Sequence, residues 1–74
     1  MRVEIVLTTR ENAKLVSRVI GHTHVRQTTD YEELYRSLAR KHFGEKHNVR
    51  PDRNLFGWVA VSGNGDTITL DQAR

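Results

Sequence analysis

The chain has 74 residues, enough for one small domain with a single core but too few for a two-domain enzyme or a repeat array. It contains no cysteine, which excludes disulfides, zinc ribbons and thiol chemistry. No apolar run approaches the roughly 18 residues of a membrane span, and charge interrupts the short apolar start, unlike in a secretory signal. We therefore expect residues 1–74 to form one soluble, cytoplasmic domain.

Positive charge is concentrated in one part of the sequence. The net charge is +3. Residues 36–53 hold six basic and two acidic residues, whereas residues 1–35 are balanced. An arginine-rich stripe is the usual electrostatic mark of a phosphate-binding surface. A solvated surface with a modest basic excess is the alternative that the sequence leaves open. The six basic residues are Arg36, Arg40, Lys41, Lys46, Arg50 and Arg53.

The first 21 residues predict a strand followed by a helix. Residues 2–8 alternate apolar and polar side chains with the period of a half-buried strand. Thr8 and Glu11 then have the spacing of a capping box, and Gly21 stands where a left-handed helix end is expected. The aliphatic residues between them fall on one helical stripe, although three β-branched residues near its end disfavour a helix.

The middle of the chain contains the clearest helix. Residues 22–29 are rich in threonine and predict either an exposed edge strand or a loop. Residues 30–43 combine capping residues with apolar side chains at helical spacing, and Gly44 ends the pattern. The following residues, EKHNVRPDRN, include the only proline and predict a basic loop.

The last third of the chain predicts a β-hairpin. Residues 55–62 and 67–70 flank an Asn-Gly pair, the strongest short hairpin signal. A two-residue turn would place Val61 opposite Ile68 and Val59 opposite Leu70 on one apolar face. Phe56 and Trp58 would then lie on the other face of the sheet. Two large aromatic side chains on an otherwise polar face predict a surface on which bases stack. Packing inside the protein and burial in a homodimer are the alternatives.

The predicted elements define an α+β fold. We expect a two-layer sandwich, with a small, mainly antiparallel sheet and two helices on one face. The element order is strand, helix, optional strand, helix, strand, strand. In topology alone this order resembles the C-terminal domain of translation initiation factor three and the Alba chromatin proteins. Both of those architectures bind nucleic acid, so the resemblance implies that class of function, although similar arrangements also serve sulfur carriers.

These patterns favour a non-catalytic, regulatory binding protein. Its partner would be RNA or DNA, or a nucleoprotein, with basic side chains on phosphates and aromatic side chains on bases. The main alternative is a protein-interaction module, an inhibitor or adaptor of a larger enzyme, that meets an acidic protein surface with the same residues. No cofactor and no membrane partner is expected. The predicted binding residues are Arg36, Arg40, Lys41, Lys46, His47, Arg50, Arg53, Phe56 and Trp58.

Catalysis and metal binding receive less support. A metal-free ribonuclease toxin would need arginine, histidine and an acid in one place, and the region around His42, Glu45 and His47 supplies those residue types. No spacing rule supports that assignment. The four histidines have no carboxylate at ligand spacing, so no metal site is predicted.

Overall fold

The computed structural model describes residues 1–73 and contains one five-stranded antiparallel sheet and one helix. The α+β class is therefore confirmed. The strands lie in the order β2-β1-β5-β4-β3, so β2 and β3 form the two edges. No helix in the described part of the chain is long and apolar enough to cross a membrane. The elements are β1 (Arg2–Glu11), β2 (Lys14–His24), α1 (Tyr31–Phe43), β3 (His47–Pro51), β4 (Trp58–Ser62) and β5 (Thr67–Gln72).

The prediction of two helices is wrong, because the first predicted helix is a strand. Instead of ending near Thr8, β1 continues to Glu11 and turns back through Asn12 and Ala13 into β2. Both turn residues have positive φ, 51° and 64°, as a two-residue hairpin turn requires. Pairing along the whole of β1 suits the β-branched residues that disfavoured a helix. The observed element order therefore differs from the one that carried the topological resemblance.

The second predicted helix is confirmed. The Asp30 side chain accepts a hydrogen bond from the Glu33 N–H at 3.1 Å and caps α1. At the other end, Gly44 has φ of 76°, and its N–H donates to the Arg40 carbonyl. Before the helix, β2 already ends at His24, and only loop residues lead from there to α1. The predicted basic loop after the helix is wrong in part, because residues 47–51 form the edge strand β3.

The predicted hairpin forms, but its register differs by one residue. Ala60 lies opposite Ile68 and Val61 lies opposite Thr67. Only Gly65 in the turn has positive φ, at 87°, so Asn64 does not adopt the paired left-handed conformation of a two-residue turn. The loop has three residues instead. A one-residue shift reverses the faces of a strand, so Ala60 and Trp58 lie on the same side as Ile68.

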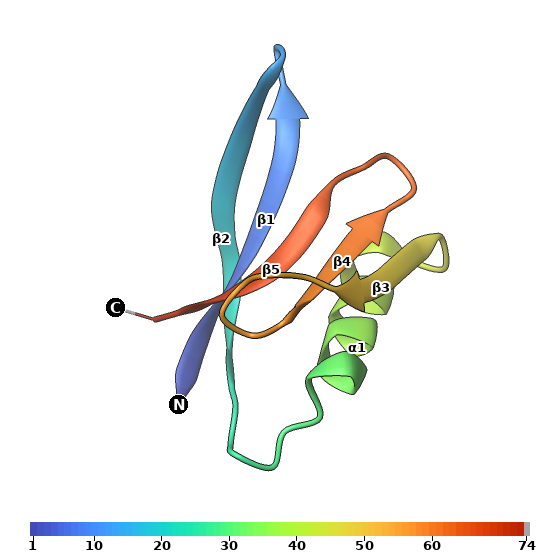
Figure 1. The fold of residues 1–74 in the computed structure, drawn as a ribbon. Helices are drawn as coiled ribbons and strands as arrows, with labels where there is room; N and C mark the ends of the chain where they lie inside the picture. The colour runs from blue at the N-terminus through green and yellow to red at the C-terminus, as the bar shows by residue number, and fades with distance from the viewer. Residues whose placement is uncertain (74) are drawn as a thin grey trace.

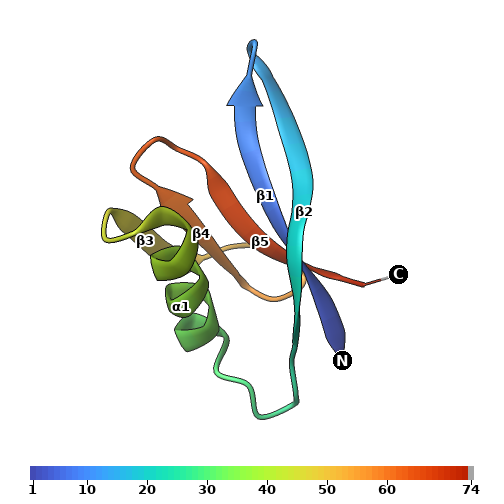
Figure 2. The same ribbon diagram turned by 180° about the vertical axis from the view of Figure 1, so that it is seen from behind.

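One face of the sheet is covered on only one half. The backbone of α1 lies close to β3, β4 and β5 but not to β1 or β2 (Figures 1 and 2), although Val3 and Ile5 of β1 are buried in the same core as the helix side chains. The core between the layers includes Tyr35, whose Oη accepts a hydrogen bond from the Leu70 N–H at 2.8 Å. Burial raises the pKa of Tyr35, and the hydrogen bond from Leu70 opposes that rise only in part. The helix is therefore fixed to β5 by a buried polar contact as well as by apolar packing.

Candidate functional site

The two aromatic residues predicted to stack on bases do not form an exposed platform. Phe56 is only 9% exposed and belongs to the core, and Trp58 is half-buried against that core. The Phe56 ring packs on the Tyr31 ring of α1, with centroids 5.5 Å apart and planes tilted by 39°. The expected exposed aromatic face is thus wrong, because the shifted register turns Trp58 toward the helix side and the loop before β4 buries Phe56 against α1.

A network around Asn54 holds Phe56 in that position. The Asn54 Oδ1 accepts hydrogen bonds from the N–H groups of Phe56 and Gly57, at 3.0 and 2.8 Å. The Asn54 Nδ2 donates to the Trp58 carbonyl at 2.6 Å. Gly57 has φ of 81°, which lets the chain turn sharply into β4. The loop from β3 to β4 is therefore built to bury its aromatic residue.

The basic residues of 36–53 remain on the surface. Arg36 is compensated within the helix, because its Nη2 lies 3.1 Å from the Glu32 carboxylate. The other five are exposed and have no acidic partner within 4 Å among residues 1–73. We call these five the basic edge, since they lie on the last turn of α1, on the edge strand β3 and on its flanking loops. They are Arg40, Lys41, Lys46, Arg50 and Arg53.

The fold brings the helix part of the basic edge close to the start of β3. Because α1 packs directly on β3, the C-terminal turn of the helix lies beside the start of that strand (Figure 2). His47 helps to join them, since its Nδ1 lies 2.7 Å from the Gly44 carbonyl oxygen. The Lys46 carbonyl accepts a hydrogen bond from the Gly63 N–H at 3.2 Å, which ties this end to the β4–β5 turn.

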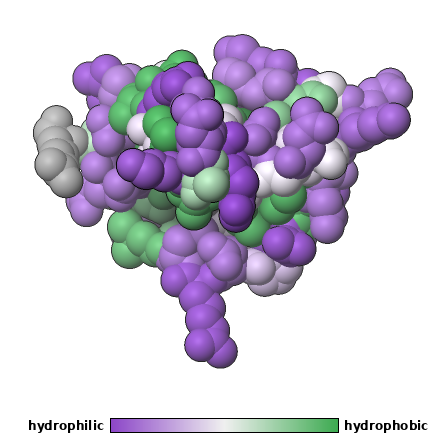
Figure 3. All heavy atoms as spheres, turned by 90° about the horizontal axis from the view of Figure 1, so that it is seen from above, coloured by the Kyte–Doolittle hydropathy of each residue, from purple (hydrophilic) through white to green (hydrophobic). Residues whose placement is uncertain are grey.

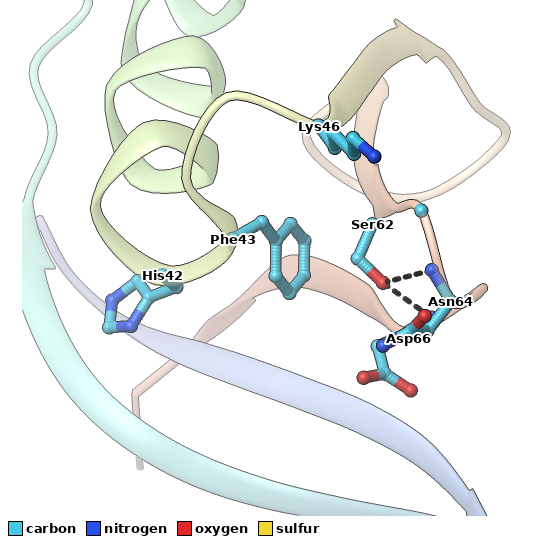
Figure 4. A pocket seen from close by; sticks show the side chains of 7 residues that line it. His42, Phe43, Lys46, Ser62, Asn64 and Asp66 are labelled. Carbon is cyan, nitrogen blue, oxygen red and sulfur yellow. Dashed lines mark hydrogen bonds between the residues drawn. The ribbon is translucent and has the colours of Figure 1, made fainter.

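Two shallow hollows flank Lys46. The first lies between the end of α1 and the β4–β5 turn, with His42 and Phe43 on one side and Ser62 and Asp66 on the other (Figure 4). In that turn the Ser62 Oγ accepts from the N–H groups of Asn64 and Asp66. The second hollow is lined by side chains of β3 and β4 on the face away from the helix. Its lining includes Lys46, His47, Asn48, Arg50 and Val61.

This part of the molecule presents lysine and arginine side chains on a largely open surface. Seen from above, the molecule is mainly hydrophilic, with separate hydrophobic patches (Figure 3). No group of three or more histidine and carboxylate side chains in the described part of the chain is placed to hold a metal ion. Part of the basic charge also has a structural role, because cations in the last turn of α1 complement the helix dipole.

Sequence reasoning missed Asn48 as a neighbour of Lys46 and Arg50. A signal for it was present, since Asn48, Val49 and Arg50 alternate outward, inward and outward as in a strand. The proline that ends this run led to its interpretation as a loop, although proline is tolerated on an edge strand. Comparisons of the chain with protein-family models, curated proteins and solved structures found no match.

Proposed function

We propose that the protein is a non-catalytic binding protein that contacts nucleic-acid phosphates through the basic edge. The observation that carries this proposal is that five exposed cations on the last turn of α1, on β3 and on its flanking loops lack an acidic partner among the described residues, and that two of them, Lys46 and Arg50, line one hollow. Lysine and arginine that neutralise phosphates release condensed counterions, which is the main source of affinity in sequence-independent binding.

The mode of binding differs from the one that the sequence predicts. Phe56 is buried in the core and Trp58 is half-buried against it, so the proposal does not include base stacking on these two residues. Arg50 and Lys46 instead line a hollow together with the amide of Asn48, and arginine suits a phosphate because of its planar fork of donors. Contacts of this kind fix the orientation of a nucleic acid without reading its sequence.

The test is a titration of labelled RNA and duplex DNA of about 20 nucleotides, followed by fluorescence anisotropy at about 50 and 200 mM salt. We expect binding to both probes, with an affinity that falls steeply with salt. Replacing Lys46 and Arg50 by alanine should weaken binding to every sequence and, for the duplex DNA probe, lower the salt slope by about 1.8 log units per log unit of salt.

The matched control removes two exposed cations elsewhere, Arg2 and Arg26. This control should lose less affinity than the variant of the basic edge, because the lost charges lie outside the proposed contact. Equal losses in both variants would show that only net charge matters and would contradict a defined site. Absence of binding to either probe at low salt would overturn the proposal and favour a protein partner.

A further inference from the structure

The strand β2 presents a long edge that nothing in the described residues covers. It has 11 residues and pairs with β1 alone. No other helix or strand contacts it. The unpaired N–H and C=O groups along such an edge are ready to pair with a further strand. The opposite edge, β3, is short and ends in Pro51, which limits pairing there.

Two exposed hydrophobic side chains lie on this edge strand. Leu15 is 70% exposed and Val19 is 50% exposed. Ser17 stands midway between them, so all three share the face of β2 that points away from the helix side. That face is identified by the pairing, since Ser17 lies opposite Thr8 and the two hydroxyl oxygens are 2.8 Å apart.

The equal spacing makes β2 complementary to itself. If two copies pair antiparallel about a two-fold axis at Ser17, Leu15 of each copy lies opposite Val19 of the other. Two apolar cross-strand pairs then flank a central pair of serines. Such pairs stabilise a sheet because their Cβ atoms lie about 5 Å apart. Shifting the axis by one residue would break both apolar pairs at once.

Charge is compatible with the same register. On the other face of the regular part of β2, which ends at the bulge at Ile20, Arg18 would lie opposite Val16 of the second copy and not opposite a cation. The charge of Arg18 is already compensated inside its own chain. Its Nη2 donates to both carboxylate oxygens of Glu11, at 2.8 and 3.0 Å.

The helix leaves room for this pairing. Because α1 covers only β3, β4 and β5, it lies on the half of the sheet remote from β2 (Figure 1). From these observations we infer that a second copy of this chain docks on β2, forming a two-fold dimer with one continuous ten-stranded sheet. Both helices would lie on the same side of that sheet, and the basic edge of each copy would lie at its outer end.

Single-cysteine variants test this arrangement directly, because the natural chain has no cysteine. Ser17→Cys places the thiol at the two-fold axis, where the facing Cβ atoms approach the separation of a disulfide. Val19→Cys lies on the same edge, but its two copies would be about 13 Å apart. Ser37→Cys on α1 is the exposed control away from the dimer seam.

Under mild oxidation we expect Ser17→Cys to form a covalent dimer faster than the other two variants, by about tenfold or more. Faster crosslinking of Val19→Cys would overturn the proposed register, and equal rates in all three variants would overturn the docking surface.

Sedimentation of the natural chain from about 1 μM to about 1 mM gives an independent measure of dimer formation. We expect dimers that the double change Leu15→Lys and Val19→Lys abolishes. A natural chain that stays monomeric throughout would contradict the proposal.

Discussion

The two halves of the sheet are stabilised in different ways. On one half, β3, β4 and β5 are covered by α1, and the side chains between the layers include Tyr35 and Ile68, both fully buried. On the other half, residues 9–16 form a two-stranded arm that extends beyond the last pair of β1 with β5, Thr8 with Thr67 (Figure 1). Strand pairing and a few surface contacts are all that hold this arm.

The comparison shows that a regular hairpin does not need a helix over it to form. The arm of residues 9–16 buries little apolar surface, and an isolated two-stranded hairpin is marginally stable in water. Stability should therefore be highest in the covered half and lowest at the tip of the arm. The unpaired edge of β2 follows from the same arrangement, since a second helix or a sixth strand would have covered it.

Changing Ile68 to alanine should give the largest loss of stability and so the clearest difference between the two halves. Ile68 is fully buried beneath α1, so the lost methyl groups and the resulting cavity should lower the free energy of unfolding by about 2–5 kcal/mol. The matched variant is Leu15→Ala on the arm, which should change it by no more than about 0.5 kcal/mol. Urea unfolding at low protein concentration measures both. Similar losses would mean that the arm carries as much of the stability as the core.

Changing Tyr35 to phenylalanine should have the next largest effect. The buried N–H of Leu70 would lose its acceptor, at a cost of about 1–3 kcal/mol in unfolding free energy. An unchanged stability would show that this hydrogen bond contributes nothing.

The natural chain should also lose stability in alkali because of Tyr35. Its pKa is raised above the ordinary value of 10.0 by burial, so the folded state holds the proton that the unfolded state releases. The stability that the protonated Tyr35 contributes is fully present below pH 10 and is lost as the pH rises through the pKa of Tyr35 in the folded state. Unfolding curves of Tyr35→Phe between pH 9 and 11 should show a smaller decline than those of the natural chain. An identical decline would contradict this assignment.

The turn at the tip of the arm should give the smallest effect. Ala13 has φ of 64°, a left-handed conformation that costs a residue with a Cβ about 1–2 kcal/mol. Ala13→Gly converts the turn to Asn-Gly, and we expect the arm to gain up to about 1 kcal/mol of local stability. The amide exchange of residues 9–16 measures this gain. Faster exchange in the variant would contradict the turn geometry.

The sequence predicted an element correctly where its capping residues, its apolar spacing and its end signal all indicate the same structure. In α1 the cap at Asp30, the apolar stripe and Gly44 all indicate the same helix, and the structure has it. The segment after Thr8 carries conflicting signals. A capping-box spacing favoured a helix, whereas strand pairing with β1 depends on contacts between residues that single-sequence periodicity does not weigh. Asn12-Ala13 is also a poor turn signal, because alanine rarely adopts positive φ.

The candidate site was predictable in its charges but not in its aromatic residues. Exposed arginine and lysine follow from composition alone, and the five residues of the basic edge are on the surface as expected. The face of Trp58 depended on one residue of register, which the three-residue turn around Gly65 changed, whereas Phe56 lies in the loop before β4 and is placed by Asn54 and the turn at Gly57. Binding at the basic edge stays a prediction that the titration addresses.

The most direct test of the difference between the two halves is native-state amide hydrogen exchange, measured by NMR at low protein concentration. We predict that the amides of Ile68 and Leu70 on β5 exchange only through global unfolding, whereas the paired amides of residues 9–16 exchange through local opening at lower free energy. Exchange of the arm amides as slow as that of β5 would contradict the account. It would mean that the hairpin and the covered half of the sheet form one cooperative unit.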